Sequence, residues 1–335
     1  MTKTNGDNTP ATGRRLPPHG QPYVFAPHDL VAGRYKIVRV LGAGGSAEVY
    51  EALDIALGGA VALKTLRPML ANHAVQLERF RREIQNARKI THLNVCRIFD
   101  MGLHGEGRGQ RFFLTMELLR GESLADRLAA GPAYTTNDAL TVALQICAGL
   151  QAAHEAGVVH RDLKPGNVMF ANASPTGSGE RVAITDFGLA LSEEQQDLRL
   201  TESGELLGTP EYMAPEQAEP GEMTPATDVY ALGLILYEML TKRQPFATAG
   251  TPLATVLRRR HDPPEPLRAH LPTVDPIWES TIHRCLEREP ARRFQSAAEI
   301  AAALEGRGPP EPGQGAPRDG GGTFGRFVDR FRRRR

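Results

Sequence analysis

The sequence predicts an α+β fold with two lobes, a small β-rich lobe near the N-terminus and a larger helical lobe after it. Short runs rich in β-branched and aromatic residues, each bounded by glycine or a polar turn, fill residues 35–66. After Gly121 the apolar residues recur at helical spacing, interrupted by long irregular stretches such as 160–225. A chain of 335 residues is long enough for two such lobes around a shared cleft.

The elements of the smaller lobe follow one another closely along the chain. Three antiparallel strands are expected at residues 35–42, 47–54 and 60–66. Residues 77–91 place their apolar side chains at helical spacing, and residues 111–119 form a further strand that leads into the second lobe.

The larger lobe is expected to contain four strong helices. They cover residues 138–156, 227–241, 276–287 and 295–304. The longest uncharged stretch, 139–153, predicts a buried helix because it is shorter than the roughly 20 apolar residues of a membrane-spanning helix.

Composition changes mark the limits of the folded part. Residues 306–325 contain 12 glycines or prolines, which indicates a linker after the last helix. The expected divisions are a flexible leader at 1–33, a folded unit at 34–304 with lobes at 34–117 and 121–304, and a linker with a basic tail at 305–335.

Charge and cysteine content restrict the class of protein. Forty Lys and Arg residues against 39 Asp and Glu residues give a net charge of +1, which argues against nucleic acid as a partner. The cysteines Cys96, Cys147 and Cys285 have no metal-binding spacing, and the first residues lack the apolar core of a secretion signal. A reduced, cytoplasmic location is therefore expected.

A glycine-rich loop connects the first two expected strands. It consists of Leu41, Gly42, Ala43, Gly44, Gly45, Ser46, Ala47, Glu48 and Val49. Its backbone N–H groups can approach a polyphosphate closely, although a simple hairpin turn has a similar composition. On the third strand, Lys64 needs an anion to offset its desolvation, and Glu83 on the helix that follows can pair with it.

Two short segments of the second lobe concentrate polar groups suited to phosphate transfer. HRDLKPGN places Asp162, Lys164 and Asn167 within one irregular stretch, and Asp186 follows 19 residues after Asn167 as the first residue of DFG. The oxygens of Asn167 and Asp186 suit Mg²⁺. Asp162 can accept a proton from a hydroxyl group, and Lys164 can contact a transferring phosphoryl group.

Together with Ala214-Pro-Glu216, these segments occur in an order and spacing that resemble the eukaryotic-type (Hanks-type) protein kinases, in particular the bacterial Ser/Thr protein kinases. The resemblance runs from Tyr35 to Leu304. It implies the bilobal protein kinase fold, with ATP bound between the lobes. It also implies a Ser/Thr protein kinase, a transferase that moves the γ-phosphoryl group of Mg-ATP to protein hydroxyls in signal transduction.

The resemblance assigns roles to single residues. It implies Asp162 as the catalytic aspartate, Lys64 and Lys164 as phosphate contacts, and Asn167 and Asp186 as Mg²⁺ ligands. Glu83 is implied as the partner of Lys64 in the active arrangement. The residues implied around adenine and the hinge are Val49, Ala62, Met116, Glu117, Leu119 and Met169. Those implied as structural support are Asp228, Glu216 and Arg293.

Two departures from the family pattern leave the chemistry intact. Ala47 replaces the third glycine of the loop, and Glu289 replaces a usual aspartate. Since every charged group that the reaction needs is present, an active enzyme is favoured over a nucleotide-binding scaffold. A small-molecule phosphotransferase of related fold is disfavoured by the segment 214–216 and its expected partner Arg293.

Regulation by phosphorylation is a further implication. Arg161 precedes the catalytic aspartate, and such an arginine binds a phosphate on the activation loop. Thr201 and Ser203 lie seven and five residues before Gly208, where bacterial relatives carry autophosphorylated residues. Autophosphorylation at Thr201, at Ser203 or at both, through a transient dimer, is expected.

The last residues form a basic, aromatic tail. Residues 326–335 contain six arginines and one aspartate, and Phe324, Phe327, Val328 and Phe331 fall on one face of a helix. This pattern is typical of a segment that contacts an anionic membrane surface. The alternatives are a solvated tail and a stub beside a membrane-spanning segment outside this chain.

Overall fold

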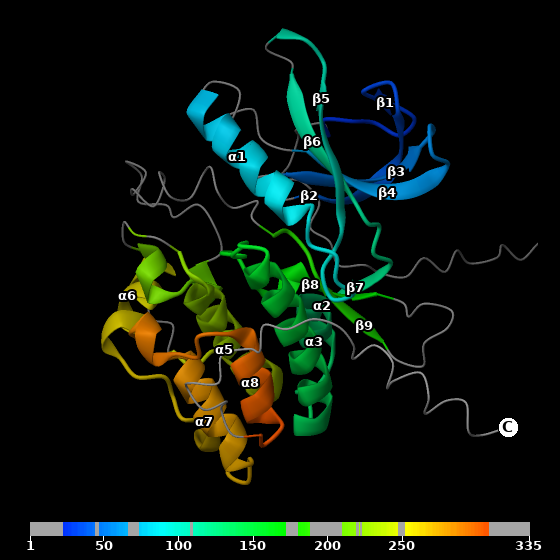
Figure 1. Ribbon diagram of the computed structural model, residues 1–335. Coiled ribbons are helices and arrows are strands. Elements are labelled where there is room, and N and C mark those ends of the chain that lie inside the picture. Colours follow the sequence, from blue (N-terminus) through cyan, green and yellow to red (C-terminus); the bar gives the residue numbers. More distant parts are fainter. Residues whose placement is uncertain are drawn as a thin grey trace, which may run out of the picture.

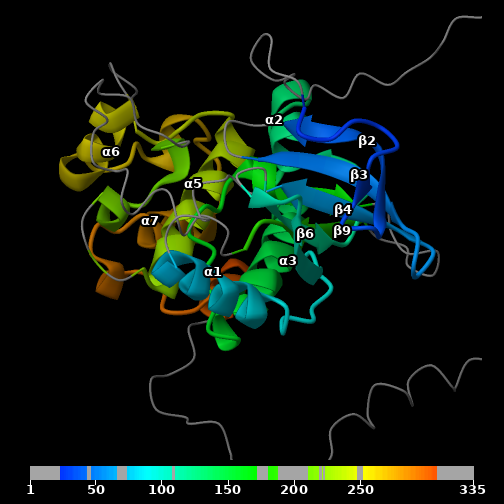
Figure 2. The same cartoon turned by 90° about the horizontal axis from the view of Figure 1, so that it is seen from above.

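The computed structural model describes residues 23–43, 47–65, 74–107, 110–171, 180–187, 210–218, 221, 223–246 and 252–307. These residues form two lobes, one built on a β-sheet and one built on helices (Figure 1). Seen from above, helix α1 (Ala74–Ala87) lies over the helical lobe, with the strands of the sheet to one side of it (Figure 2). The expected α+β class and the two-lobe arrangement are confirmed.

The smaller lobe is a six-stranded antiparallel sheet. Its strands are β1 (Leu30–Val31), β2 (Tyr35–Ala43), β3 (Glu48–Asp54), β4 (Gly59–Thr65), β5 (Ile98–His104) and β6 (Arg111–Met116), in the spatial order β1-β2-β3-β4-β6-β5. The sequence pattern predicted four of these strands but missed β1 and β5. Strand β1 has only two residues, and β5 lies at an edge where Ile98 alone is buried, so neither shows a strong apolar alternation.

Helix α1 is fixed to this lobe by the apolar side chains near its C-terminal end. Ile84 and Ala87 are buried, and they belong to one cluster with Ile98 and Leu114 of the sheet. Because Glu83 directly precedes Ile84, this packing determines where the carboxylate of Glu83 can lie. The helix begins and ends before the limits expected from the sequence.

In the described part of the larger lobe, the four expected helices and two more are present. Its helices are α2 (Leu124–Ala130), α3 (Thr136–Glu155), α5 (Pro225–Thr241), α6 (Pro252–His261), α7 (Pro276–Cys285) and α8 (Ala297–Leu304). Short 3₁₀ turns occur at Pro165–Asn167, Pro210–Tyr212, Pro215–Ala218, Leu267–Ala269 and Pro290–Arg292.

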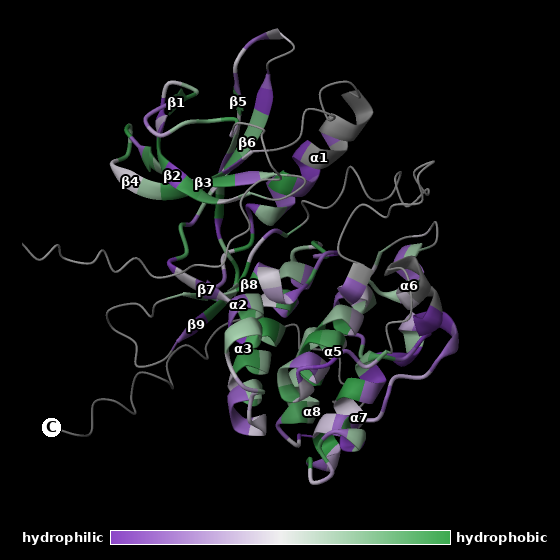
Figure 3. Cartoon of the chain, turned by 180° about the vertical axis from the view of Figure 1, so that it is seen from behind, coloured by the Kyte–Doolittle hydropathy of each residue, from purple (hydrophilic) through white to green (hydrophobic). Residues whose placement is uncertain are grey.

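Helix α5 is the centre of this lobe. It is predominantly hydrophobic in Figure 3, and Leu232, Leu234, Ile235 and Leu236 on successive faces are fully buried. Helices α3 and α7 pack against it. Among the described residues, no helix combines the length and hydropathy needed to cross a bilayer. The uncharged stretch lies in α3, where Ala139, Ile146 and Leu150 are fully buried, so it is a buried helix, as expected.

A small second sheet joins the lobes. It consists of β7 (Gly121–Ser123), β8 (Val168–Ala171) and β9 (Arg181–Ile184). The backbone of Ile184 bonds on both sides to the segment after α1, accepting from the N–H of Cys96 at 2.8 Å and donating to the carbonyl of Asn94 at 2.9 Å. Strands of three or four residues are too short to be predicted from periodicity. This sheet matters because β8 and β9 carry two of the candidate site segments.

Candidate active site

Asp228, in the first turn of α5, holds the segment that contains Asp162. One carboxylate oxygen (Oδ2) accepts a hydrogen bond from the backbone N–H of His160 at 2.8 Å, and the other (Oδ1) accepts from the N–H of Arg161 at 2.9 Å. His154 contacts the same carboxylate through Nε2 at 2.7 Å. Arg161 has a φ of 69°, a left-handed conformation that non-glycine residues adopt when their surroundings enforce it. The buried carboxylate thus enforces the turn before Asp162.

Asp162, Lys164 and Asn167 converge within this turn. The ammonium of Lys164 lies 2.7 Å from Oδ2 of Asp162. The side-chain amide of Asn167 donates to the backbone carbonyl of Asp162 at 2.7 Å, so the three side chains have fixed relative positions. Asp162 and Lys164 keep 30% and 27% of their side-chain surface exposed, which leaves them open to a substrate.

Asp186 reaches this group because β8 and β9 are paired. Val168 lies opposite Ile184, and the next N–H, that of Thr185, donates to the carbonyl of Asn167 at 2.8 Å. His160 adds a contact from its Nε2 to the carbonyl of Thr185 at 2.8 Å. His160 therefore supports the loop from below through hydrogen bonds. Asp186 follows immediately, with a φ of 67°.

Lys64 completes the cluster from the other lobe. Its Nζ atom lies 2.9 Å from Oδ1 of Asp186. Burial raises the pKa of the Asp186 carboxyl, but the charge and hydrogen bond of Lys64, together with the charges of His160 and Lys164, lower it by more, so this pKa lies below its usual range. A series of contacts, with Thr185 as the link between Asp186 and Asn167, now connects Lys64, Asp186, Asn167 and Asp162, which are separated by up to 122 positions in the chain.

The ion pairs differ from the pair expected between Lys64 and Glu83. Lys64 pairs with Asp186, and Glu83 instead pairs with Arg161, at 3.4 Å between Oε1 and Nη1. All four side chains are mostly buried, so each charge needs a nearby counter-charge. The Lys64–Asp186 and Arg161–Glu83 pairs provide these counter-charges, so all four charges are compensated without the expected Lys64–Glu83 pair.

The donor atoms present are suitable for Mg²⁺. Mg²⁺ in proteins is usually bound by one or two carboxylates together with water and substrate phosphates. The amide nitrogen of Asn167 is engaged by Asp162, which leaves its side-chain oxygen as the remaining donor of that group. The second carboxylate oxygen of Asp186 is likewise outside its ion pair with Lys64. Within the described part of the chain, no cluster of three His, Cys, Asp or Glu residues suggests another metal site.

Most of the residues expected around adenine belong to one apolar cluster of the smaller lobe. In the strand register, Val49 lies opposite Lys64 and Ala62 lies opposite Met116. Ala62 and Met116 are buried in one cluster, against which Val49 and Leu119 pack. Met169, on β8 of the other lobe, is also buried. In the glycine-rich loop, the structure describes Leu41, Gly42 and Ala43 on β2 and Ala47, Glu48 and Val49 on or before β3.

The backbone of Glu117 is already partly occupied. Its N–H donates to the carbonyl of Arg97 at 2.9 Å, and its carbonyl accepts from the thiol of Cys96 at 3.6 Å. Of the two groups, only the carbonyl retains capacity for a further bond, because a carbonyl oxygen has two lone pairs. The carboxylate of Glu117 bonds to the guanidinium of Arg181, so its side chain ties the hinge to β9.

Several expected residues lie outside the described part of the chain. They are Gly44, Gly45 and Ser46 of the glycine-rich loop and the phosphorylation candidates Thr201 and Ser203. Most of the leader, at 1–22, and the tail, at 308–335, also lie outside it.

The segment 210–218 is anchored by buried arginines. Arg293, fully buried, bonds to both carboxylate oxygens of Glu216 at 2.7 and 2.8 Å, as expected. Arg259, which the sequence analysis missed, donates to the carbonyls of Met213 and Glu211. It stands in the run Arg258–Arg260 at the end of α6, where sequence alone predicts solvent-exposed charges. Both arginines therefore fix the backbone that follows the activation loop.

Two lobes with a lysine, two aspartates and an asparagine gathered where they meet define the class of protein kinases. A family model described as "Protein kinase domain" matches residues 35–303, and the chain belongs to this family.

Known proteins similar to this chain agree with that membership. The serine/threonine-protein kinase PknA of Mycobacterium tuberculosis is 37% identical over 294 residues, which cover 86% of this chain and 65% of PknA. A probable serine/threonine-protein kinase of Corynebacterium efficiens is 35% identical over 280 residues, covering 82% of this chain and 41% of that protein. The chain thus spans less than two thirds of the length of either relative.

Solved structures show the same fold. The crystal structure of the Mycobacterium tuberculosis PknI kinase domain matches with a TM-score of 0.64 and 25% identity, over 84% of this chain and 99% of that domain.

Proposed function

We propose that this chain is a Ser/Thr protein kinase that transfers the γ-phosphoryl group of Mg-ATP to hydroxyls of protein substrates. The observation that carries the proposal is the series of contacts that joins Lys64, Asp186, Asn167 and Asp162 across the two lobes. These residues supply, in one place, the cation, the metal ligands and the carboxylate that phosphoryl transfer requires. The similarity to named Ser/Thr kinases supports the same acceptor class.

In this proposal each group has one task. Asn167 and Asp186 hold Mg²⁺, which neutralises charge on the phosphates when it is bound. Lys64 contacts the α- and β-phosphates, Lys164 contacts the γ-phosphate, and Asp162 orients the acceptor hydroxyl and takes its proton. Since Lys164 already contacts Asp162, the two groups are positioned together for the acceptor and the transferred group.

The nucleotide is proposed to lie between the adenine pocket and the glycine-rich loop. Val49, Ala62, Met116 and Met169 enclose the base, and the carbonyl of Glu117 and the backbone of Leu119 offer hydrogen bonds. The residues of the loop that cover the phosphates are Leu41, Gly42, Ala43, Gly44, Gly45, Ser46, Ala47 and Glu48.

We further propose that activation exchanges the ion pairs. A phosphate on Thr201 or Ser203, added by autophosphorylation in a transient dimer, attracts Arg161 and releases Glu83 to pair with Lys64. Asp186 is then released to bind Mg²⁺. A cytoplasmic site of action is proposed for this cycle, and contact of the tail with an anionic membrane surface is a second proposal about location.

Transfer of radiolabelled phosphate from ATP to a Ser/Thr-containing protein tests the proposed activity. The variants Asp162→Asn and Lys64→Met are expected to lose transfer by about 10³-fold or more while the protein still folds, as judged by its circular dichroism spectrum. Near-normal transfer by either variant would refute the assignment. Absence of transfer by the wild type, with retained binding of ATP, would instead support the nucleotide-binding scaffold.

A further inference from the structure

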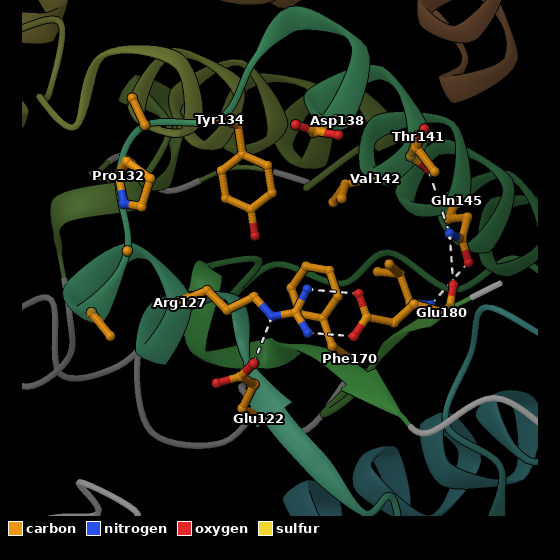
Figure 4. A pocket seen from close by; sticks show the side chains of 14 residues that line it. Glu122, Arg127, Pro132, Tyr134, Asp138, Thr141, Val142, Gln145, Phe170 and Glu180 are labelled. Atoms are coloured by element: carbon orange, nitrogen blue, oxygen red, sulfur yellow. Dashed lines mark hydrogen bonds and ion pairs between the residues drawn. The ribbon is translucent and has the colours of Figure 1, made fainter.

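A cavity of about 690 Å³ lies in the larger lobe (Figure 4). It is enclosed by α2 and the loop after it, by the first half of α3 and by β8 and β9. None of the residues assigned above to the nucleotide, the metal or the acceptor lines it. Cavities of 300–1,000 Å³ are the usual size of ligand sites in proteins.

The floor of this cavity is apolar. Val142, Phe170 and Val182 are buried below it, and Pro132 and Tyr134 form a wall (Figure 4). The hydroxyl of Tyr134 is buried without a hydrogen-bond partner, and burial raises its pKa. The floor therefore suits aromatic or aliphatic side chains, and the Tyr134 hydroxyl offers one unused polar contact.

The rim of the cavity is acidic. Glu122, Asp138 and Glu180 are exposed, whereas Arg127 is the one cation among the lining residues. Three carboxylates and one guanidinium give a net charge of −2 at neutral pH.

Arg127 cannot move freely to neutralise the rim. Its guanidinium stacks 3.6 Å above the ring of Phe170 and bonds to Glu122 and Glu180 at once. The other carboxylate, Asp138, accepts a hydrogen bond only from a neutral hydroxyl, that of Thr135. The excess negative charge thus faces solvent and favours a cationic ligand.

We propose that the C-terminal segment of this same chain, residues 324–335, binds intramolecularly in this cavity. Phe324, Phe327 and Phe331 match the apolar floor, and six arginines against one aspartate match the acidic rim. Arginine is the side chain best suited to the carboxylates of the rim, because its planar group can bond to both oxygens of a carboxylate.

The segment is close enough to reach the cavity. Helix α8 packs along α3, with the N–H of Ala298 3.2 Å from Oε1 of Gln151, two helical turns from the cavity residue Gln145. By helical rise, the end of α8 lies within about 30–35 Å of the cavity. The 16 residues between Arg307 and Phe324 span up to about 55 Å when extended. Such a short tether produces a millimolar effective concentration, so weak contacts suffice for occupancy.

Cross-linking in the full chain tests this proposal. One variant carries Thr141→Cys at the cavity rim together with Thr323→Cys beside the tail. The matched control carries Ser280→Cys on α7 with Thr323→Cys, because α7 lies next to the start of the linker, where Gly306 approaches Ile277. The native Cys96, Cys147 and Cys285 are buried, and burial raises the pKa of all three thiols, so a short bismaleimide reacts with the introduced pair.

The expected result is an intramolecular 141–323 link formed in at least about fivefold higher yield than the 280–323 link. Changing Phe327→Ser with Phe331→Ser should reduce the yield to the control level. Changing Glu122→Gln with Asp138→Asn should lower it by about fivefold. The proposal requires a lower cross-linking yield with both kinds of substitution, because the first removes the apolar contacts of the tail and the second removes the acidic charges of the rim.

Three outcomes would overturn the proposal. The first is a 141–323 yield no higher than the control, and the second is a yield unaffected by either the phenylalanine or the acidic-rim substitutions. The third is a link found only between isotopically distinct chains, which would mean that the tail binds a second copy. If no 141–323 link forms but vesicles containing phosphatidylglycerol sediment the chain through residues 324–335, the partner of the tail is the membrane, and the proposal fails.

Discussion

The guanidinium of Arg161 lies 3.4 Å from the carboxylate of Glu83, and thereby connects the catalytic loop directly to helix α1. The same arginine precedes Asp162, and its backbone N–H is held by Asp228. Arg161 therefore makes two separate sets of contacts, because its backbone N–H bonds to Asp228 and its side chain pairs with Glu83. A substitution of the side chain can test the second set alone.

We predict that Arg161→Met raises the activity of the unphosphorylated protein by about fivefold and abolishes further stimulation by phosphorylation. The ion pair is only 21% exposed on either side, so losing it favours the alternative pairing of Glu83 by about 1 kcal/mol. Transfer rates before and after phosphatase treatment provide the measurement. The control is Arg82→Met, which removes an exposed arginine next to Glu83 on α1. An unchanged basal rate in Arg161→Met would show that the pair does not restrain the enzyme.

Asp228→Asn should destabilise the protein by about 2–4 kcal/mol and abolish activity. The carboxylate of Asp228 accepts hydrogen bonds from the backbone N–H groups of His160 and Arg161, and the substitution replaces one of its oxygens with an NH₂ group that cannot accept. Since Asp228 is only 1% exposed, water cannot replace the lost bond. Urea unfolding measures the loss. The matched control is Asp275→Asn at the exposed start of α7, where asparagine caps a helix as well as aspartate does. Equal unfolding midpoints for the two variants would contradict the role assigned to Asp228.

Arg293→Met should cost about 3–5 kcal/mol of stability, because it leaves the carboxylate of Glu216 without its buried partner. It also removes the donors to three backbone carbonyls, those of Ala226, Glu287 and Arg288. The neighbouring Arg292→Met is the control, since the pair of Arg292 with Glu289 is 66% and 65% exposed and should be worth less than about 1 kcal/mol. Calorimetric unfolding of both variants should therefore separate them clearly, and similar transition temperatures would count against the buried pair.

The candidate site was more predictable from sequence than the details of its contacts. HRDLKPGN and DFG bring Asp162, Lys164, Asn167 and Asp186 together through short local turns and the β8–β9 pairing, so their identities sufficed. The partner of Lys64 was not predictable in this way. Whether Glu83 or Asp186 pairs with it depends on the position of α1 relative to the sheet, a tertiary choice between two carboxylates of similar chemistry.

The fold shows the same division between strong local patterns and tertiary context. The long helices α3 and α5 were predicted because their apolar residues recur over many turns. The edge strand β5 and the three-residue strand β7 carry too few buried side chains for a pattern to be visible. The burial of Arg259 was equally invisible, since an arginine within a basic run is usually exposed and only the carbonyls of Glu211 and Met213 explain its position.

The Lys64–Asp186 pair predicts a specific dependence of stability on pH. Because the pKa of Asp186 is lowered in the folded protein, its ionised form contributes stability at any pH above the unfolded value of about 4. This contribution decreases as the pH falls below that value and is lost once the pH passes through the lower pKa of the folded state. Asp186→Asn should therefore lower the urea midpoint at pH 7 and at pH 5 by similar amounts, with a smaller difference from the wild type at pH 3.5. Asp262→Asn, at an exposed aspartate after α6 and away from the site, serves as the control. A difference for Asp186→Asn that stays constant or grows as the pH falls would show that the ionised carboxylate does not stabilise this arrangement.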